Sequence, residues 1–484
     1  MGTLYPYQDE GVKFLTVIGK AILADDVGLG KTLQALTAAK LTKPIRVLIV
    51  CLKTGKLVWI SEIKKWLGDK VEVKMVSGNN AVADIFAPTD FTIINYDMLG
   101  TRTYEDEDEN GKPYKWTDRR YLDPIASQKW DVIIFDEAHR LKNRKSKAFE
   151  AAKLICRKAN PSYIFFLTAT PLQNKPEEAW PLLHLIDPNK YSSFWRWIGQ
   201  YCYVHQAWWN RKITVIDEVV NPEELRKELG QYMIRRVKED VWNEMPTLTY
   251  QDYPVELLPE QRKVYDEMHH RMSVEVGGKT IDAVTALAQV TRLKQIAVSP
   301  DLLVPCTEGI SGINGAKIRA LQDILSGIGD QRFVIFSQYA RAIYGILPII
   351  HKEYDILVFT GETDWKERAS TIERFQDPNS KHRGIMTTTQ CGGQSIDLTA
   401  ASVVIFLDLL WNPQLNYQAV GRVHRAGQTR PVTVINLLAV DTIEDYVQKV
   451  LKAKQAMFDQ LIPVTRINKI ATEYLKQQSS EPTH

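Results

Sequence analysis

Residues 21–34 have the sequence AILADDVGLGKTLQ, which brings two glycines, a lysine and a threonine into one short segment. Gly28 and Gly30 let backbone N–H groups close around phosphate oxygens, and the start of a following helix adds a favourable dipole. Lys31 can reach the β- and γ-phosphates of a nucleotide, and the Thr32 hydroxyl can bind Mg²⁺. The segment therefore predicts a phosphate-binding loop between a strand and a helix.

This segment departs from the strict phosphate-loop pattern at its first position, where Asp25 replaces glycine. On the segment alone, a turn with a chance Gly-Lys-Thr run stays open as an alternative. We include Leu29 and Gln34 among the expected nucleotide-binding residues. Gln8 is a further candidate, because its amide can pair with adenine N6 and N7 and so select ATP. Taken alone, such a glutamine is more often simply exposed.

Residues 131–139 have the sequence DVIIFDEAH, an apolar strand that ends in two acids. At the carboxyl end of such a strand, Asp136 can hold Mg²⁺ through water, and Glu137 can polarise an attacking water. The same acids within a helix would more often be surface charge. Their position behind a buried strand and downstream of a phosphate loop favours ATP hydrolysis with Mg²⁺.

Residues 418–428, QAVGRVHRAGQ, hold two arginines three positions apart. On a helix, Arg422 and Arg425 would share a face. Pointed at a nucleotide, they could neutralise charge on the transferring phosphoryl group, as arginine fingers do. The alternative, a solvated or nucleic-acid-facing basic helix, would be favoured if this segment stood alone.

These residues need elements to position them, and short apolar runs that alternate with amphipathic stretches supply them. Continuous runs of this length suit strands that are covered on both faces, as in a parallel sheet. We therefore predict an α/β fold with two parallel-sheet halves and crossover helices. The predicted strands are residues 45–51, 91–95, 132–135 and 163–167 in the first half, and 332–336, 355–359, 384–388, 403–407 and 432–437 in the second.

The stretch between the halves, residues 190–305, lacks this strand rhythm, and we predict that it is mostly helical. Within it, residues 194–212 carry four tryptophans together with basic side chains. Such a mixture can bind nucleic acid by stacking and charge, although aromatics at helical spacing more often form a small core. Residues 101–120 are polar, include the acidic run Glu105–Glu109, and predict a solvated loop or a small insertion. The last residues, QQSSEPTH, predict a disordered tail.

Composition restricts the class of protein. Apolar residues make up 44% of the 484 and the net charge is 61 − 58 = +3, so a nucleic-acid site would need locally concentrated positive charge. The 5 cysteines form no CxxC pair, which argues against structural zinc and a disulfide framework. We find no signal peptide and no apolar run of membrane-spanning length, and expect a soluble intracellular protein.

Taken in order, the motifs resemble the Swi/Snf-type family of superfamily-two helicase-like ATPases. The resemblance extends from about Tyr5 to Asp445 and is most specific at residues 411–428. The matching segments are LADDVGLGKTLQ (23–34), VLIVCLKTGKLVWISEIKKW (47–66), LTATPLQN (167–174), IRRVKEDV (234–241), VIFSQY (334–339), MTTTQCGGQSIDLTAA (386–401) and WNPQLNYQAVGRVHRAGQ (411–428). The chain departs from the usual family residues at Asp26, Val27, Cys51, Ala169, Gln390, Cys391, Gln394, Ser395 and Gly421.

The resemblance implies two RecA-like lobes with ATP in the cleft between them. Residues 1–245 would form lobe one, with a helical protrusion at about 190–232. Residues 246–463 would form lobe two, with a helical insertion at about 260–305, and 464–484 a final helix and tail. The nucleotide would contact Lys31, Thr32, Asp136 and Glu137 on one side and Arg422 and Arg425 on the other. The residues expected to couple this site to nucleic acid are Thr168, Thr170, Thr387, Thr388 and Trp411.

By this resemblance we expect an ATP-driven motor that moves on double-stranded DNA without lasting strand separation, as a monomer. Such a compact chain resembles bacterial, archaeal or phage members, which predicts a cytoplasmic location, or a nuclear one in a eukaryote. Forks, branches and protein-bound DNA all stay open as substrates. Two other functions stay open: a strand-separating helicase on DNA or RNA, and a nucleic-acid-binding scaffold with a vestigial ATPase.

Overall fold

The computed structural model describes the chain except for residues 1–3, 78–80, 108–112, 173–174, 208–209, 242–244, 277–278, 284, 304–312, 393–395, 426 and 462–484. Several predictions fall outside the described residues: the end of LTATPLQN, two of the four clustered tryptophans, Gln394, Ser395 and the tail. The chain forms two compact units, Met1–Asn243 with Met457–His484 and Glu244–Ala456. None of the described helices is long and apolar enough to cross a membrane.

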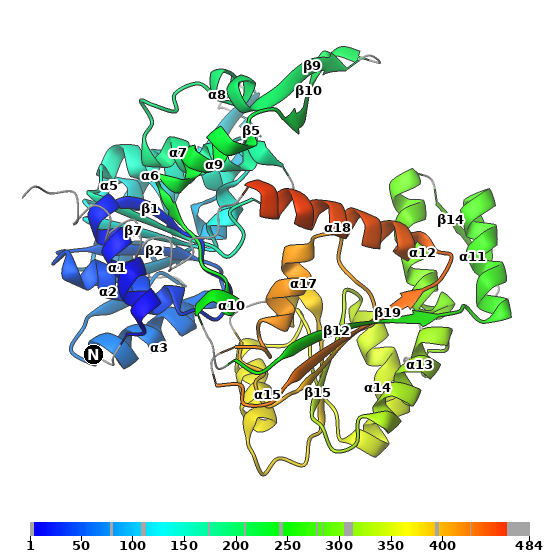
Figure 1. The fold of residues 1–484 in the computed structure, drawn as a ribbon. Coiled ribbons are helices and arrows are strands. Elements are labelled where there is room, and N and C mark those ends of the chain that lie inside the picture. Colours follow the sequence, from blue (N-terminus) through cyan, green and yellow to red (C-terminus); the bar gives the residue numbers. More distant parts are fainter. Residues whose placement is uncertain are drawn as a thin grey trace, which may run out of the picture. The chain divides into compact units, whose positions relative to one another are not determined.

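Unit 1 is built on a 7-stranded, wholly parallel sheet with the order β11-β1-β8-β7-β2-β4-β3 (Figure 1). The strands β2, β4, β7 and β8 confirm the four predicted apolar runs. Their bounds are β1 Lys20–Leu23, β2 Val47–Cys51, β3 Val73–Met75, β4 Phe91–Asn95, β7 Val132–Asp136, β8 Tyr163–Leu167 and β11 Met233–Ile234.

Helices cover both faces of this sheet, which is why its central strands are apolar on both sides. Phe165 and Phe166 of β8 point to opposite faces and enter separate hydrophobic clusters. One face is covered by α1 Pro6–Ile18, α2 Lys31–Leu41 and α3 Gly55–Leu67. The other is covered by α4 Ala81–Phe86, α5 Leu122–Ser127, α6 Lys147–Ala159 and α7 Trp180–Ile186.

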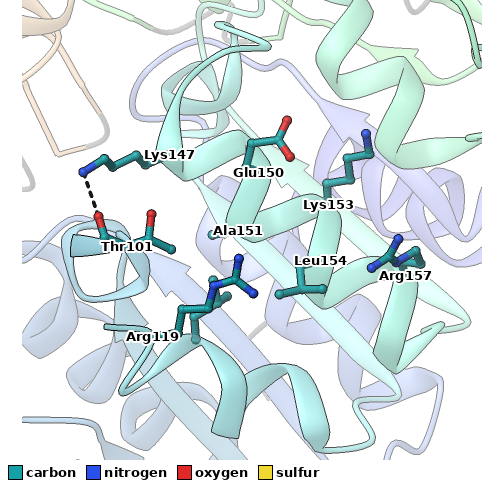
Figure 2. A pocket seen from close by; sticks show the side chains of 9 residues that line it. Thr101, Arg119, Lys147, Glu150, Ala151, Lys153, Leu154 and Arg157 are labelled. Carbon is teal, nitrogen blue, oxygen red and sulfur yellow. Dashed lines mark hydrogen bonds between the residues drawn. The ribbon is translucent and has the colours of Figure 1, made fainter. Parts of the chain in front are cut away.

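Helix α6 fixes the loop after β4 as well as the sheet. Its first residue, Lys147, donates from Nζ to the Thr101 carbonyl at 2.7 Å (Figure 2). Just beyond Thr101, β5 Arg102–Glu107 and β6 Pro113–Asp118 form an antiparallel hairpin. Of the two alternatives predicted for residues 101–120, a solvated loop or a small insertion, the structure shows the insertion, because cross-strand pairing gives this polar segment its own ladder.

The predicted protrusion of unit 1 is mixed rather than helical. It consists of α8 Phe194–Tyr201, an antiparallel pair β9 Cys202–Ala207 and β10 Asn210–Val219, and α9 Pro222–Gly230. The β-branched run Ile213–Ile216 finds a partner strand, which helical spacing does not anticipate. Trp197 is buried in the core, whereas Trp195 is half exposed. Arg144 lies over the ring of Phe194 beside it, 4.2 Å from the centroid.

Unit 2 is built on a 6-stranded parallel sheet with the order β12-β19-β18-β15-β17-β16. All five apolar runs predicted for the second half are present as strands, which confirms the α/β class with two parallel sheets. The bounds are β12 Leu248–Val255, β15 Phe333–Ser337, β16 Leu357–Phe359, β17 Gly384–Thr388, β18 Val403–Phe406 and β19 Val432–Ala439. The covering helices are α13 Ala316–Gly327, α14 Ala340–Tyr354, α15 Trp365–Gln376 and α17 Pro413–Val420.

The predicted helical insertion of unit 2 contains two helices, α11 Pro259–Arg271 and α12 Ala286–Val298. Between them lies an antiparallel pair, β13 Ser273–Val276 and β14 Lys279–Asp282, which the sequence analysis missed. Tyr265, Met268 and Ile296 belong to a separate small core that this subdomain shares with the end of β19.

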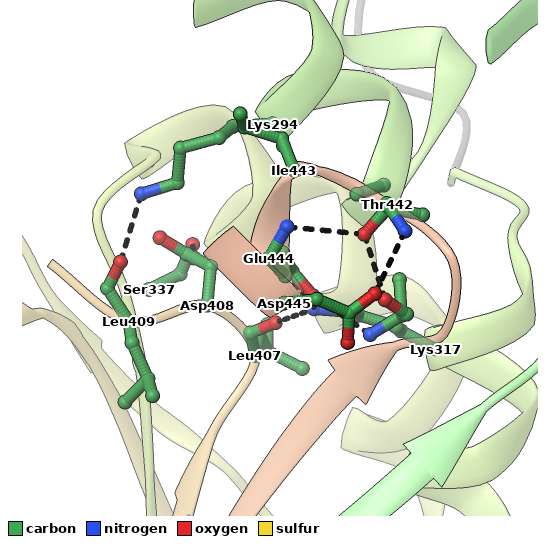
Figure 3. A network of polar contacts seen from close by, with 12 residues as sticks. Lys294, Lys317, Ser337, Leu407, Asp408, Leu409, Thr442, Ile443, Glu444 and Asp445 are labelled. Atoms are coloured by element: carbon green, nitrogen blue, oxygen red, sulfur yellow. Dashed lines mark hydrogen bonds and ion pairs between the residues drawn. The ribbon is translucent and has the colours of Figure 1, made fainter. Parts of the chain in front are cut away.

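A buried ion pair joins α13 to α18 Ile443–Leu461 at the edge of this sheet (Figure 3). Lys317 Nζ bonds both carboxylate oxygens of Glu444, at 2.8 and 2.6 Å, and donates to the Leu407 carbonyl at 2.6 Å. Glu444 also accepts from the Ala439 N–H at 2.8 Å. Two residues after Leu407, the Leu409 carbonyl accepts from Lys294 Nζ of α12 at 2.8 Å. Two lysines thus fix the chain that follows β18.

We predict that Glu444→Gln destabilises the protein by about 3–5 kcal/mol, because it leaves the Lys317 charge buried and uncompensated. Chemical unfolding followed by far-UV circular dichroism measures this. The double variant Lys317→Met/Glu444→Gln removes both charges and should recover most of the loss. A double variant as unstable as the single one would show that lost packing, rather than the charge, causes the effect.

Candidate functional site

The phosphate-loop candidate lies between β1 and α2, as predicted. Gly28 and Gly30 have φ angles of 91° and 74°, in the left-handed region that glycine adopts without strain. Gly30 caps α2, so that Lys31 and Thr32 are the first two residues of the helix. The loop therefore presents backbone N–H groups, a helix amino terminus, an amine and a hydroxyl together, which fits an anionic phosphate group.

Lys31 is turned into its own loop. Its Nζ donates to the carbonyls of Asp25 at 2.6 Å and Asp26 at 3.0 Å. Burial lowers the pKa of Lys31, and the negative charge of Glu137 is the largest influence that raises it. The two acids at the end of β7 and the amine of the loop are thus close enough to interact. The parallel order β1-β8-β7 places both segments at the carboxyl edge of the sheet.

Asp136 is held in place by three neighbours. Its side chain accepts from Trp59 Nε1 and from the Glu137 N–H, both at 2.9 Å. Its carbonyl accepts from the Tyr96 hydroxyl at 2.8 Å. Burial, and then the adjacent charge of Glu137, raise the pKa of Asp136 to about 6. Sequence analysis missed Trp59 and Tyr96, although a buried tryptophan needs a partner for its N–H.

Glu137 has a left-handed backbone conformation, with φ at 49°, which is strained for a residue with a side chain. Its carboxylate lies 3.2 Å from His139 Nδ1. The same ring nitrogen lies 3.5 Å from the Thr168 hydroxyl at the end of β8. Glu137, His139 and Thr168 therefore form a chain of polar contacts from β7 to β8.

Carboxylate and hydroxyl oxygens are among the ligands that Mg²⁺ prefers, so the side chains of Thr32 and Asp136 suit this ion.

Gln8 lies against the phosphate loop rather than in solvent. Its Nε2 is 3.4 Å from the Leu29 carbonyl, and its Oε1 accepts from the Tyr5 N–H at 3.1 Å. A Cβ at Gly30 would come within 2.6 Å of the Gln8 amide nitrogen, so any larger residue there would displace this side chain as well as strain the backbone, whose φ is 74°. The structure thus brings Gln8, Leu29 and Gly30 together, and a contact of Gln8 with adenine stays a prediction.

Asp25, the residue that breaks the strict loop pattern, has a buried partner. Its carboxylate accepts from Arg236 Nε at 2.9 Å and Nη2 at 2.5 Å, and from Gln34 Nε2 at 3.0 Å. Gln34 is fully buried, and its amide also donates to the Leu29 carbonyl at 3.1 Å. Arg236 was not among the predicted site residues, although it lies in the IRRVKEDV segment singled out by the family resemblance.

The threonines expected to couple the site to nucleic acid are buried. Thr168, Thr170 and Thr387 have no exposed surface, and Thr388 is 9% exposed. They lie at the carboxyl ends of β8 and β17 or directly after them. In this conformation they can act on a bound strand only through other residues.

The two candidate arginines of unit 2, Arg422 and Arg425, do not lie on a helix. The expectation that they share a helix face was therefore wrong. Helix α17 ends at Val420, and the chain continues through turns that include a bond from the Arg422 N–H to the Ala419 carbonyl at 3.1 Å. Arg425 donates to the Ile396 carbonyl at 3.2 Å. Trp411, just before α17, has Lys294 over its ring at 5.5 Å.

Two hollows in unit 1 with a surplus of basic side chains were not predicted from the sequence. One, of about 520 Å³, lies past the ends of β2 and β4, and its charged lining residues are Lys53, Lys56 and Arg120 together with Asp97 and Asp118. The other, of about 460 Å³, lies beside α6 and is shown in Figure 2. Its cationic side chains are Arg119, Lys147, Lys153 and Arg157, and its acidic one is Glu150. Spacings of three and four along α6 were the available signal.

Comparison with known families gives two matches along the chain. The SNF2-related domain matches residues 7–302, which is more than half of the chain. The helicase conserved C-terminal domain matches residues 316–427. These ranges include the phosphate loop and acids of unit 1 and the arginines of unit 2, in the expected order.

Individual proteins agree with this assignment. SWI/SNF-related matrix-associated actin-dependent regulator of chromatin subfamily A member 1 of Mus musculus is 30% identical over 98% of this chain and 45% of its own length. The ISWI chromatin-remodeling complex ATPase ISW1 of Saccharomyces cerevisiae is 28% identical over 95% of this chain and 40% of its own. DNA annealing helicase and endonuclease ZRANB3 of Mus musculus is 26% identical over 93% and 40%.

The chain thus spans less than half the length of these relatives. A solved structure, the Sulfolobus solfataricus SWI2/SNF2 ATPase core in complex with dsDNA, covers 95% of this chain and 93% of that chain, with 25% identity and a TM-score of 0.43. With a phosphate loop, paired acids and both family domains in order, the chain belongs to the SNF2-related family and is a helicase-like ATPase.

Proposed function

We propose that this protein is an ATP-dependent translocase on double-stranded DNA that remodels DNA structures or protein–DNA complexes without processive strand separation. The observation that carries the proposal is that the phosphate loop after β1, with Lys31, and the acids Asp136 and Glu137 at the end of β7 lie at the same carboxyl edge of one parallel sheet. A phosphate-binding amine and two acids in this arrangement suit phosphoryl transfer to water.

In this proposal, each residue of the site in unit 1 has one task. Lys31 leaves the Asp25 and Asp26 carbonyls and neutralises phosphate charge, while Thr32 and Asp136 hold Mg²⁺. When bound, Mg²⁺ supplies positive charge to the β- and γ-phosphates. Glu137 orients and polarises the attacking water, and His139 passes a change at Glu137 to Thr168 at the end of β8. Gln8 selects adenine beside Leu29.

Arg422 and Arg425 of unit 2 would complete the site by stabilising negative charge on the transferring phosphoryl group. An arginine in this role contributes mainly in the transition state. ATP binding would then draw the two units together, and product release would let them separate. Alternation between these states supplies the motion that a translocase requires.

The hollow past β2 and β4 supports DNA as the track, because its lining carries Lys53 and Arg120 beside Asp97 and Asp118, with the buried Lys56 giving a small surplus of positive charge. It lies past the ends of β2 and β4, in the same sheet and toward the same edge as the phosphate loop. Lysine and arginine contacts to phosphates bind without sequence preference and weaken with salt. Family membership supports the same assignment, since the names of relatives refer to chromatin remodeling and to DNA annealing.

Steady-state ATP turnover with no nucleic acid, single-stranded DNA, blunt duplex DNA and duplex RNA tests this proposal. We expect stimulation mainly by duplex DNA. A third strand bound to a duplex should then be displaced during ATP hydrolysis, while a labelled strand of a forked duplex stays paired. Stimulation mainly by single strands or RNA, with strand release from the fork, would instead identify a strand-separating helicase.

Glu137→Gln should reduce ATP turnover by about 10²–10⁴-fold while ATP still binds, because the amide cannot polarise water. Lys31→Ala is the matched comparison: it should lose turnover and bind ATP more weakly, because the phosphate charge is no longer neutralised. Binding of a fluorescent ATP analogue and phosphate release separate the two effects. Fast hydrolysis by Glu137→Gln would remove Glu137 from this role.

Arg425→Ala should lower DNA-stimulated ATP turnover by about 10³-fold or more, with little change in affinity for duplex DNA. Arg430→Ala is the control, since Arg430 is an exposed arginine of the same segment that bonds the Ala400 carbonyl. DNA affinity is measured by fluorescence anisotropy without nucleotide. Loss of DNA affinity with normal turnover per bound complex would make Arg425 a track contact.

Affinity for Mg·ATP should fall as pH decreases through about 6, because Mg²⁺ must displace the proton that Asp136 then carries. Above that pH the carboxyl is ionised and its contribution is constant. ATP itself titrates nearby, so Asp136→Asn is the control: it cannot titrate and should show only the dependence of the nucleotide. Titration calorimetry from pH 5.5 to 8, a range of about 2.5 units around this pKa, compares the two. Identical pH profiles would contradict the assignment.

A further inference from the structure

A buried arginine from a distant part of the chain is bonded to the phosphate loop. Arg236 and Asp25 have no exposed side-chain surface, and the guanidinium makes a forked pair with the Asp25 carboxylate through Nε and Nη2. The backbone N–H of Arg236 also donates to Asp25 Oδ1 at 3.1 Å. Nη1 donates to the Tyr7 carbonyl of α1, and Nη2 to Gln34 Oε1 of α2 at 2.8 Å. One side chain thus bonds α1, the loop and α2.

The backbone around Arg236 follows the loop as well. The Ala24 N–H donates to the Ile234 carbonyl at 2.8 Å, and the Asp26 N–H donates to the Arg236 carbonyl at 3.0 Å. These bonds continue the parallel pairing of β1 and β11 beyond the end of β1. Residues 24–26, the first half of the loop, are therefore hydrogen-bonded along their backbone to residues 234–236.

Helix α1 packs closely against this network. A Cβ at Gly11 of α1 would overlap both the Gln34 amide and the Arg236 guanidinium. Gln34 lies between Asp25 and Arg236 and bonds both, so its amide is fully occupied by the loop's supports. The same network gives a structural role to two residues of this segment. Asp25, which stands where the strict pattern has glycine, is the partner of Arg236. Gln34, which was expected to contact the nucleotide, bonds both Asp25 and Arg236.

We propose that Arg236 is a positioning residue for ATP turnover, which sets the phosphate loop through Asp25 and makes the IRRVKEDV segment part of the nucleotide site. Arg236 fixes the Asp25 side chain, and the Asp25 carbonyl accepts the Lys31 amine at 2.6 Å. Gln34 is a second support in this arrangement rather than a nucleotide contact. The inference rests on the proposed ATP hydrolysis at this loop.

A buried ion pair by itself adds little stability, because desolvation offsets most of the attraction. The fixed geometry of the pair bears on catalysis instead, since small displacements of a catalytic group reduce rates strongly.

Two matched double variants test the proposal. Asp25→Asn/Arg236→Met removes both charges of this pair. The asparagine keeps a side-chain oxygen that can accept from the backbone N–H of residue 236 or from the Gln34 amide. Lys317→Met/Glu444→Gln makes the same chemical change in the buried pair of unit 2. Arg236→Lys adds a third comparison, because it keeps the charge and loses the fork. Thermal unfolding, ATP affinity, KM, kcat and duplex-DNA affinity are measured for each.

We expect both double variants to fold and to bind duplex DNA like the wild type. Only the Asp25/Arg236 variant should lose kcat/KM for ATP, by at least about tenfold and mostly through KM, with Arg236→Lys in between. Wild-type kcat/KM in a folded Asp25/Arg236 variant would overturn the proposal. Absence of ATP turnover in the wild type would instead overturn the proposed function, so the two failures are distinguishable.

A measurement on the wild type keeps the test decisive if Arg236 variants do not fold. Hydrogen–deuterium exchange is followed with and without a non-hydrolysable ATP analogue and Mg²⁺. Protection of residues 24–34 should be accompanied by protection of residues 232–238, which bond the loop. Protection of the loop with unchanged exchange at 232–238 would overturn the proposal.

Discussion

The candidate nucleotide site in unit 1 depends on one constraint, the parallel direction of β1, β8 and β7. Parallel strands end at the same edge, so the loop after β1 and the acids after β7 meet there although more than a hundred residues separate them. The order of the sheet inserts β8 between them, which also brings Thr168 to His139. An antiparallel arrangement would have sent these groups to opposite edges.

Charges at that edge are held out of water, and the structure compensates each of them. Lys31 is bonded by two loop carbonyls, Asp136 by Trp59 and a backbone N–H, and Asp25 by Arg236. Desolvation lowers the pKa of Lys31 and raises that of Asp136, so burial disfavours the charged form of both groups. Shifts of the pKa in this direction are typical of functional sites.

The interior of the fold was predictable because its signal is local. A strand covered on both faces must be apolar throughout, and the nine predicted runs all occur as strands. Predictions failed where partners come from elsewhere. The segment around Ile216 looked helical and pairs as a hairpin, because its partner strand supplies the missing hydrogen bonds. Arg422 and Arg425 looked helical and follow the end of α17 instead.

The sequence by itself determined the proposed chemistry of the site, since the glycines, Lys31, Thr32 and the paired acids suggest it by their types and spacing. It also determined the α/β class, because period and apolarity are properties of neighbouring residues. Only the tertiary structure decided which residues support that chemistry. Trp59, Tyr96 and Arg236 reach the site through sheet order and helix packing. Their contacts join residues up to 229 positions apart, and no local pattern records such a pairing.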